Sequence, residues 1–304
     1  MKAIFIILLG VFILSNANSQ HLLLLRDEGM SKLSLVDTKD NSVKWQVDVP
    51  PGRDLQLVGN GRVMIGTGNG FEEREIETGK KVAEDVSWPG TITARRLSNG
   101  KTMLLGLNWQ SKEGIVLVGV GKENEKLKPI SFPGFKYARL FRVTSKGTFL
   151  ITADKEIIEG DHDGKIIWRA SIEGHSSPHA WQAIRTANGE TIVSSGYPSD
   201  LQVFSPDGTL LRRIGGPADV NPHFFSGFQR LSNGNFVVAN WQGHGPAFGA
   251  IGTQLLEYNP NGKLVWSWKQ DAGKFSSLQG VIVLDGLDLQ KLHVENEDGI
   301  LSPM

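Results

Sequence analysis

The sequence predicts an all-β fold: a six-bladed β-propeller in which every blade is a four-stranded antiparallel sheet. Two observations predict it. Strand-like runs break six times at a turn whose second residue is Gly, and these turns recur after about 39, 47, 42, 45 and 52 residues, the range of propeller repeats. The sequence that flanks these turns also repeats, as RRLSNGK at 95–101 and QRLSNGN at 229–235. The six turns are Asn60-Gly61, Asn99-Gly100, Lys146-Gly147, Asn188-Gly189, Asn233-Gly234 and Asp285-Gly286.

Each repeat divides into four short apolar runs bounded by turn residues, a pattern typical of strands. In the third repeat the expected strands are 91–97, 101–108, 114–121 and 126–132, and in the sixth they are 225–231, 235–241, 254–259 and 263–269. Asn-Gly and Asp-Gly favour two-residue type I′ turns, which need positive φ at both central positions. The strands of each repeat are therefore expected to form successive antiparallel hairpins.

The ends of the chain predict how the ring closes. The first repeat has only three strands, 21–26, 32–36 and 43–49, and the strand it lacks is found at 278–284. Pairing of 278–284 with 21–26 would close the ring and leave no free sheet edge. We therefore expect a propeller over residues 20–290 and a C-terminal tail, 291–304, lying on the surface.

The first 19 residues have the pattern of a secretory signal peptide. Lys2 precedes an apolar stretch at 3–14, and Ala17 and Ser19 occupy the positions that a signal peptidase prefers. The apolar stretch is too short for a transmembrane helix of roughly 20 residues. The sequence thus predicts a secreted or periplasmic protein that does not span the membrane.

Charge and cysteine content exclude several classes of function. Lys and Arg number 32 and so do Asp and Glu, so the formal net charge is zero, and no basic stripe suited to nucleic acid is present. There is no Cys, so neither a disulfide nor a thiolate metal site can form. The sequence 161–163, Asp-His-Asp, lies on a repeated hairpin turn and is interpreted as structural. We expect a monomer with no metal site.

The segments 161–168 (DHDGKIIW) and 259–268 (NPNGKLVWSW) resemble repeats of secreted bacterial propellers of the quinoprotein-like (PQQ-like) group. They are similar too to the repeats of arylsulfotransferases. The first resemblance implies eight blades, a metal site and often a vicinal disulfide, whereas this chain has six repeats and no Cys, so no PQQ cofactor is expected. The second implies a histidine nucleophile in the central funnel, but no motif of this chain aligns with it. The resemblance therefore concerns the scaffold.

Two histidines precede the strands expected to line the channel in adjacent blades. His179 lies in SPHAWQ, together with Trp181 and Gln182, and His223 lies in NPHFFS at nearly the same register. Imidazoles exchange protons or bind ligands near neutral pH. The structural alternative is that each histidine hydrogen-bonds a neighbouring loop.

A long loop, 240–252, supplies further candidates for ligand binding: Trp241, Gln242 and His244. Its Asn-Trp-Gln start recurs at 108–110, which adds Trp109. Gly-rich loops admit close approach of a ligand, and Trp rings stack on sugars or aromatic groups; the alternative is that the loop covers the next blade. Arg139 falls at a channel-side register and can bind an anion or a neighbouring Asp.

Two functions remain open. In the first, the protein is a binding module that holds a small ligand, a glycan or a protein at the funnel mouth through Trp109, Trp181 and Trp241. In the second, it is an arylsulfotransferase-like or other group-transfer or hydrolytic enzyme. There His179 or His223 acts as base or nucleophile and Arg139 as anion clamp.

Overall fold

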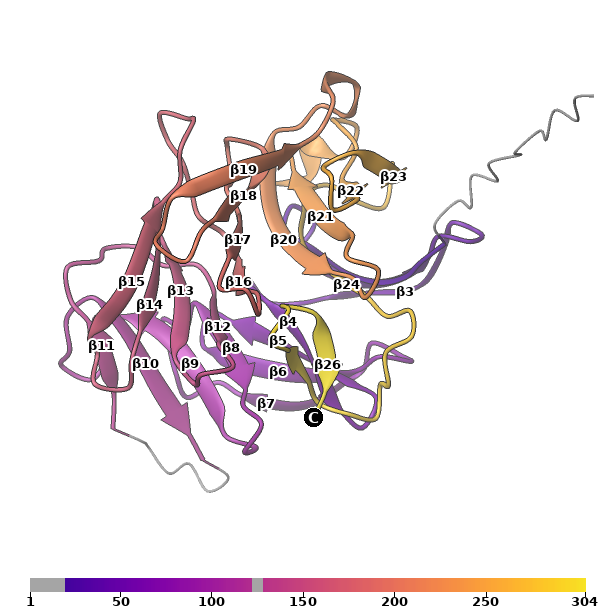
Figure 1. Cartoon of the computed structure of the whole chain (residues 1–304). Coiled ribbons are helices and arrows are strands. Elements are labelled where there is room, and N and C mark those ends of the chain that lie inside the picture. The colour runs from indigo at the N-terminus through magenta and orange to yellow at the C-terminus, as the bar shows by residue number, and fades with distance from the viewer. Residues whose placement is uncertain (1–19, 122–127) are drawn as a thin grey trace, which may run out of the picture.

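Six four-stranded antiparallel sheets surround a common channel, and the predicted all-β six-bladed propeller is confirmed (Figure 1). The computed structural model describes residues 20–121 and 128–304. The predicted signal peptide, residues 1–19, lies outside this part. Within the described ranges no helix has the length and apolar character needed to cross a bilayer.

In blades 2 to 6 the first strand lines the channel and the next three follow outward in chain order. Blades 2 and 3 comprise β4 (Leu55–Gly59), β5 (Arg62–Thr67), β6 (Gly70–Glu75), β7 (Lys81–Asp85), β8 (Thr93–Arg96), β9 (Thr102–Leu107), β10 (Ile115–Val120) and β11 (Ile130–Phe132). Blades 4 and 5 comprise β12 (Phe141–Val143), β13 (Phe149–Ala153), β14 (Glu156–Gly160), β15 (Ile166–Ser171), β16 (Ala183–Arg185), β17 (Thr191–Ser194), β18 (Asp200–Phe204) and β19 (Leu210–Gly215). Blade 6 comprises β20 (Phe224–Arg230), β21 (Phe236–Trp241), β22 (Leu255–Tyr258) and β23 (Leu264–Trp268).

Blade 1 joins the two ends of the chain, as predicted. Its strand order is β24 (Leu278–Val283), β1 (Leu22–Asp27), β2 (Lys32–Asp37) and β3 (Ser42–Asp48). β24 is antiparallel to β1, with Val281 opposite Leu25. Because Leu23, Leu24 and Leu25 are all fully buried, this pairing both completes the sheet and fills the core.

His21 reinforces the closure, since it lies between acidic groups of blade 6 and of the turn after β24. Its Nδ1 is 2.6 Å from Asp285 Oδ2 and its Nε2 is 3.2 Å from Glu257 Oε2. Burial lowers the pKa of His21, but the hydrogen bonds and charges of Glu257 and Asp285 outweigh burial and raise it above its ordinary value.

A raised histidine pKa stabilises the fold at pH values below the unfolded-state pKa, and this contribution is lost as pH rises through the folded-state pKa. We therefore expect the wild type to lose more unfolding free energy than His21→Gln between pH 6 and pH 9. Urea unfolding at several pH values measures the difference. Parallel pH curves for the two proteins would contradict the assignment.

The Gly-ending turns are present, but among the five Asn-Gly and Asp-Gly turns the type I′ prediction is right for only one. Asn60 and Gly61 both have positive φ, 52° and 66°. At the other five turns only Gly has positive φ, for example Gly100 at 80°. There the Gly100 N–H donates to the Leu97 carbonyl, so a wider turn ends on a left-handed Gly. Glycine adopts that backbone conformation without the steric cost that a Cβ adds.

Buried glutamines tie the channel-lining strands of adjacent blades together. The Gln229 Nε2 donates to the Val283 carbonyl at 3.2 Å, and its Oε1 accepts from the Val283 N–H at 2.7 Å. Gln56 makes the same pair of bonds with Arg96, and Gln182 makes it with Phe228. Each amide satisfies backbone groups that the neighbouring strand cannot reach.

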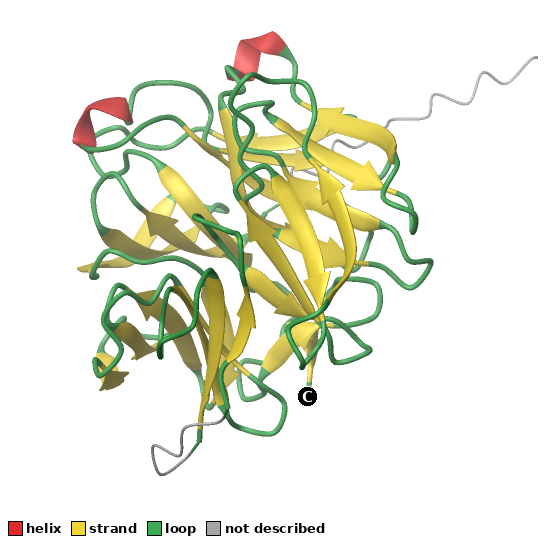
Figure 2. Ribbon diagram, turned by 90° about the vertical axis from the view of Figure 1, so that its left-hand side faces the viewer, coloured by secondary structure: helices red, strands yellow, loops and turns green. Residues whose placement is uncertain are grey.

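The C-terminal segment is not a tail on the surface, and this expectation is wrong. It forms a two-stranded hairpin, β25 (His293–Glu295) and β26 (Leu301–Pro303), and His293 is fully buried. The hairpin inserts beside the ends of the channel-lining strands, with bridges from Leu292 to Val58 and from Ile300 to Arg230. Figure 2 shows the C-terminus on one side of the ring and the two short 3₁₀ helices, η1 (Ala218–Val220) and η2 (Pro246–Phe248), on the other.

Candidate functional site

A cavity of about 420 Å³ opens at the end of the channel where the inner strands begin. All six blades contribute to its lining, through the residues just before the inner strands and through loops between second and third strands. Arg53, Thr91, Arg139 and Trp181 each lie two residues before the inner strand of their own blade. The propeller repeat therefore brings residues far apart in sequence to a single mouth.

One wall of this mouth cavity consists of aromatic rings that pack on one another. Phe224 is central: its ring centroid lies 5.6 Å from Trp181, 5.3 Å from Trp241 and 4.9 Å from Tyr197, in edge-to-face arrangements. Trp181, Phe224 and Trp241 are buried, and Tyr197 is half-buried. Mutual packing fixes these rings before any ligand arrives, so the wall is preorganised.

Two arginines face the same wall. The Arg139 guanidinium lies 4.9 Å from the Trp181 ring centroid and 4.1 Å from that of Tyr137, and the Arg53 guanidinium lies 5.6 Å from Trp181. Burial, together with the charge of Arg53, lowers the pKa of Arg139 to about 9, and burial also lowers the pKa of Arg53. Both side chains still carry their charge near neutral pH.

Glu28 holds the long loop of blade 6 against blade 1. It follows β1, and its Oε1 is 2.9 Å from His244 Nδ1 while its Oε2 accepts from Trp241 Nε1 at 3.0 Å. Because a carboxylate oxygen accepts hydrogen bonds, His244 donates its Nδ1–H to Glu28, and in a neutral imidazole Nε2 is then the acceptor. The His244 side chain is 82% exposed, so this nitrogen is accessible to solvent.

His179 and His223 both contact Tyr197, with ring centroids 5.6 and 5.7 Å from it. His179 lines the cavity, and its Nδ1 is buried without a hydrogen-bond partner among the described residues. His223 is exposed and stacks on Trp241 at 6.2 Å, outside the cavity lining. Burial lowers the pKa of both, and the charge of Arg139 lowers that of His179 further, which favours neutral imidazoles.

Three residues predicted to bind ligand do not line this cavity. Trp109 packs on Trp88, at 6.2 Å, and donates to the Pro89 carbonyl within blade 3. Gln182 joins blade 5 to blade 6 as described above, and Gln242 exchanges hydrogen bonds with Asn221. Each of these polar groups is already satisfied by a structural partner.

Among the cavity residues that sequence reasoning missed are Glu28, Arg53, Tyr137, Tyr197 and Phe224. The register of Arg139 could have revealed Arg53, since both precede an inner strand by two residues. Tyr197 and Glu28 lie in ordinary turns, and no local pattern marks them. Only the ring geometry brings these turns to the mouth.

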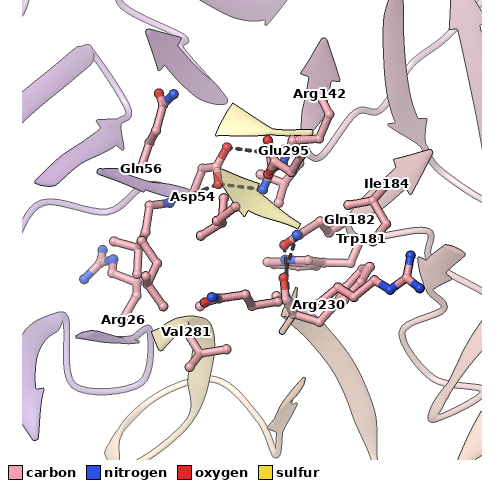
Figure 3. Close-up of a pocket in the computed structure, with 18 of the residues that line it drawn as sticks. Arg26, Asp54, Gln56, Arg142, Trp181, Gln182, Ile184, Arg230, Val281 and Glu295 are labelled. Carbon is pink, nitrogen blue, oxygen red and sulfur yellow. Dashed lines mark hydrogen bonds and ion pairs between the residues drawn. The ribbon is translucent and has the colours of Figure 1, made fainter. Parts of the chain in front are cut away.

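The far end of the channel is closed by buried charges (Figure 3). Arg142 binds Asp54 with both terminal nitrogens, at 2.8 and 3.0 Å. Glu295 of the C-terminal hairpin lies 2.7 Å from Arg95 Nη2 and 2.5 Å from Arg142 Nε. The group Asp54, Arg95, Arg142 and Glu295, the buried quartet, is therefore electrically balanced.

Arg95 is buried, with 4% of its surface exposed. A residual cavity of about 40 Å³ remains beside the quartet. Arg26, Trp181 and Gln279 line both this small cavity and the mouth cavity, so they form the floor between the two. The channel is therefore open at the mouth cavity and closed at its other end. Among the described residues no cluster of three or more His, Asp or Glu side chains could hold a metal ion.

Similarity to known proteins is confined to solved structures, since no protein-family model and no curated protein matches the chain. A protein of unknown function from Bacteroides caccae has a TM-score of 0.68 at 20% identity, over 86% of this chain and 98% of that one. A streptogramin B lyase has a TM-score of 0.53 at 12% identity, over 84% and 88% of the two chains. The calcium-binding protein regucalcin from Agrobacterium tumefaciens has a TM-score of 0.52 at 14% identity, over 86% of this chain and 95% of that one.

At such identities these similarities show a shared β-propeller fold and nothing about chemistry. The resemblance of segments 161–168 and 259–268 to quinoprotein-like and arylsulfotransferase repeats remains a likeness of sequence pattern. What the described residues establish is a six-bladed propeller with one open mouth, lined by aromatic rings and arginines.

Proposed function

We propose that the protein is a binding module that holds a small molecule in the mouth cavity, with a planar apolar part of the ligand against the aromatic wall. The single observation that carries this proposal is the packed set Trp181, Phe224, Trp241 and Tyr197 at the end of a channel closed on its other side. A volume of about 420 Å³ suits a small molecule, since such sites occupy roughly 300–1,000 Å³. A concave cup of this size favours a small ligand over a protein surface.

The test is a titration with 2-naphthamide, a neutral planar probe, followed by tryptophan fluorescence and calorimetry. We expect saturable binding by the wild type and a 2- to 10-fold loss of affinity in Tyr197→Leu, because one ring contact contributes about 0.5–1.5 kcal/mol. Trp109→Leu is the matched control, since Trp109 is also a half-buried aromatic residue but lies outside the cavity. Equal losses in both variants, or no saturable binding, would contradict the proposal.

A second candidate is group transfer or hydrolysis with a funnel histidine. The observation that favours it is the pairing of His244 with Glu28 beside a cavity that also contains His179 and Arg139. A carboxylate that holds Nδ1–H leaves Nε2 free to accept a proton. A chromogenic aryl sulfate assay on wild type, His179→Ala and His244→Ala tests it, and a wild type without turnover leaves the binding module as the function.

A further inference from the structure

Among the described residues, Arg53 and Arg139 differ from the other well-packed arginines in having neither an ion-pair partner nor a hydrogen-bond partner. Arg95, Arg142 and Arg185 form ion pairs with carboxylates. Arg26, which is 1% exposed, donates instead to the carbonyls of Lys32 and Pro50. Neither Arg53 nor Arg139 forms an ion pair or a hydrogen bond with any residue that the structure describes, and the Arg139 Nε is buried without a partner.

The two guanidiniums are also close enough to interact unfavourably. Both lie near the Trp181 ring, and the charge of Arg53 acts on the pKa of Arg139. The mouth cavity is lined by Arg26, Arg53 and Arg139 but by a single carboxylate, Glu28, whose charge favours the charged form of Arg53 while its oxygens are bonded to His244 and Trp241. Two like charges in a partly buried site raise the free energy of the unliganded protein, and an anion between them would offset this repulsion.

Stacking prepares both groups for such an anion. A guanidinium that lies over an aromatic face leaves its N–H groups at the edge free to donate, and its planar fork matches the two oxygens of a carboxylate or sulfate. The rings of Trp181 and Tyr137 therefore hold Arg139 in place without using its donors. The aromatic wall begins at the same Trp181, next to the charges.

We propose that the ligand is an amphipathic organic oxyanion, a carboxylate or sulfate attached to a planar ring, with the oxyanion bound by Arg53 and Arg139 and the ring packed on the aromatic wall. This inference rests on the proposed binding function and names its ligand class. Neutral rings and free inorganic anions satisfy only half of the site. Arg53 and Arg139 are thus the specificity-determining residues.

Calorimetric titration at low ionic strength with four probes tests the inference: 2-naphthoate, 2-naphthyl sulfate, 2-naphthamide and inorganic sulfate. We expect one or both ring oxyanions to bind at least 10-fold more tightly than 2-naphthamide, because a charge-assisted hydrogen bond contributes about 1.5–3 kcal/mol. Inorganic sulfate should bind more weakly than either ring oxyanion. The tighter of the carboxylate and the sulfate identifies the anion.

Variants assign the effect to the two arginines. Arg139→Met and Arg53→Met should each weaken binding of the preferred ring oxyanion about 10-fold or more and leave 2-naphthamide nearly unchanged. Arg169→Met is the matched control: it removes the same charge from an outer strand, where the side chain is 59% exposed, and should change nothing. Arg139→Lys should restore only part of the affinity, because a lysine lacks the planar fork.

The possible failures are distinguishable. Equal affinity for 2-naphthoate, 2-naphthyl sulfate and 2-naphthamide would overturn the anion inference and leave the binding function intact. Tight binding of inorganic sulfate without any contribution from the ring would overturn the aromatic part of the proposed function. If Arg169→Met weakened binding of the ring oxyanion as much as Arg139→Met, long-range electrostatics would explain the loss of affinity. The assigned site would then be overturned.

Discussion

Glu295→Gln is expected to lower the free energy of unfolding by about 3–5 kcal/mol, the usual effect of breaking a buried ion pair by removing one partner. Among the described residues, the variant leaves Asp54 as the only carboxylate that pairs with Arg95 and Arg142. Replacement of a charge deep in the channel removes Coulomb attraction without restoring the hydration of the two guanidiniums. Urea unfolding near pH 7, followed by tryptophan fluorescence, measures the loss.

Glu297→Gln provides the matched control, because it makes the same chemical change in the exposed turn of the same hairpin. A surface change of this kind stays within about 0.5 kcal/mol. If both variants unfold alike, the hairpin does not depend on the buried quartet for its stability.

The loss in Glu295→Gln should also depend on pH. Burial raises the pKa of Glu295, but the charges of Arg142 and Arg95 outweigh burial and hold the pKa below its ordinary value. A depressed carboxyl pKa stabilises the fold above the unfolded-state pKa, and this contribution is lost as pH falls through the folded-state pKa. The difference in unfolding free energy between wild type and Glu295→Gln should therefore become smaller as the pH falls.

Gln229→Met is expected to lower the free energy of unfolding by about 2–6 kcal/mol. The Val283 N–H and carbonyl then both lose their partner in the closed ring, and each unsatisfied backbone group costs about 1–3 kcal/mol. The same urea titration measures it. Methionine keeps the length and flexibility of glutamine, so the change isolates the hydrogen bonds from the packing.

Gln290→Met is the control for this second substitution, since Gln290 is exposed. Gln229 joins β20 to β24, the strand that closes the ring, so its substitution tests how much these hydrogen bonds contribute to ring closure. A stability loss no larger than that of Gln290→Met would show that these bonds contribute nothing net to ring closure.

The recurring Asn-Trp-Gln sequence shows why a repeated motif predicted the same ligand-binding role for Trp109 as for Trp241, although only Trp241 lines the mouth cavity. At 108–110 it opens a short turn in which Asn108, Gln110 and Ser111 have positive φ, and Trp109 turns back onto its own blade. At 240–252 the longer loop contains η2 and lets Trp241 reach Glu28 of blade 1. Loop length, rather than the shared tripeptide, decides which Trp faces the mouth.

The sequence by itself determined the blade count, the strand boundaries to within a few residues and the closure of the ring by 278–284. These follow from local turn chemistry and apolar alternation, which the chain repeats six times. It also indicated Arg139, His179, Trp181, Trp241 and His244, all of which line the mouth cavity, because each stands at a repeat position or in an unusual loop.

Only the tertiary structure decided which groups converge. The hydrogen bond from His244 to Glu28 and the ion pairs of Glu295 with Arg95 and Arg142 join residues from different blades, and Arg53 and Arg139 meet at the mouth without a carboxylate partner among the described residues. Their side chains meet because six repeats curve into a ring, and no local sequence period encodes a contact between residues separated by one or more blades. The scaffold is therefore a local property of this chain, and the chemistry of its mouth is a property of the closed ring.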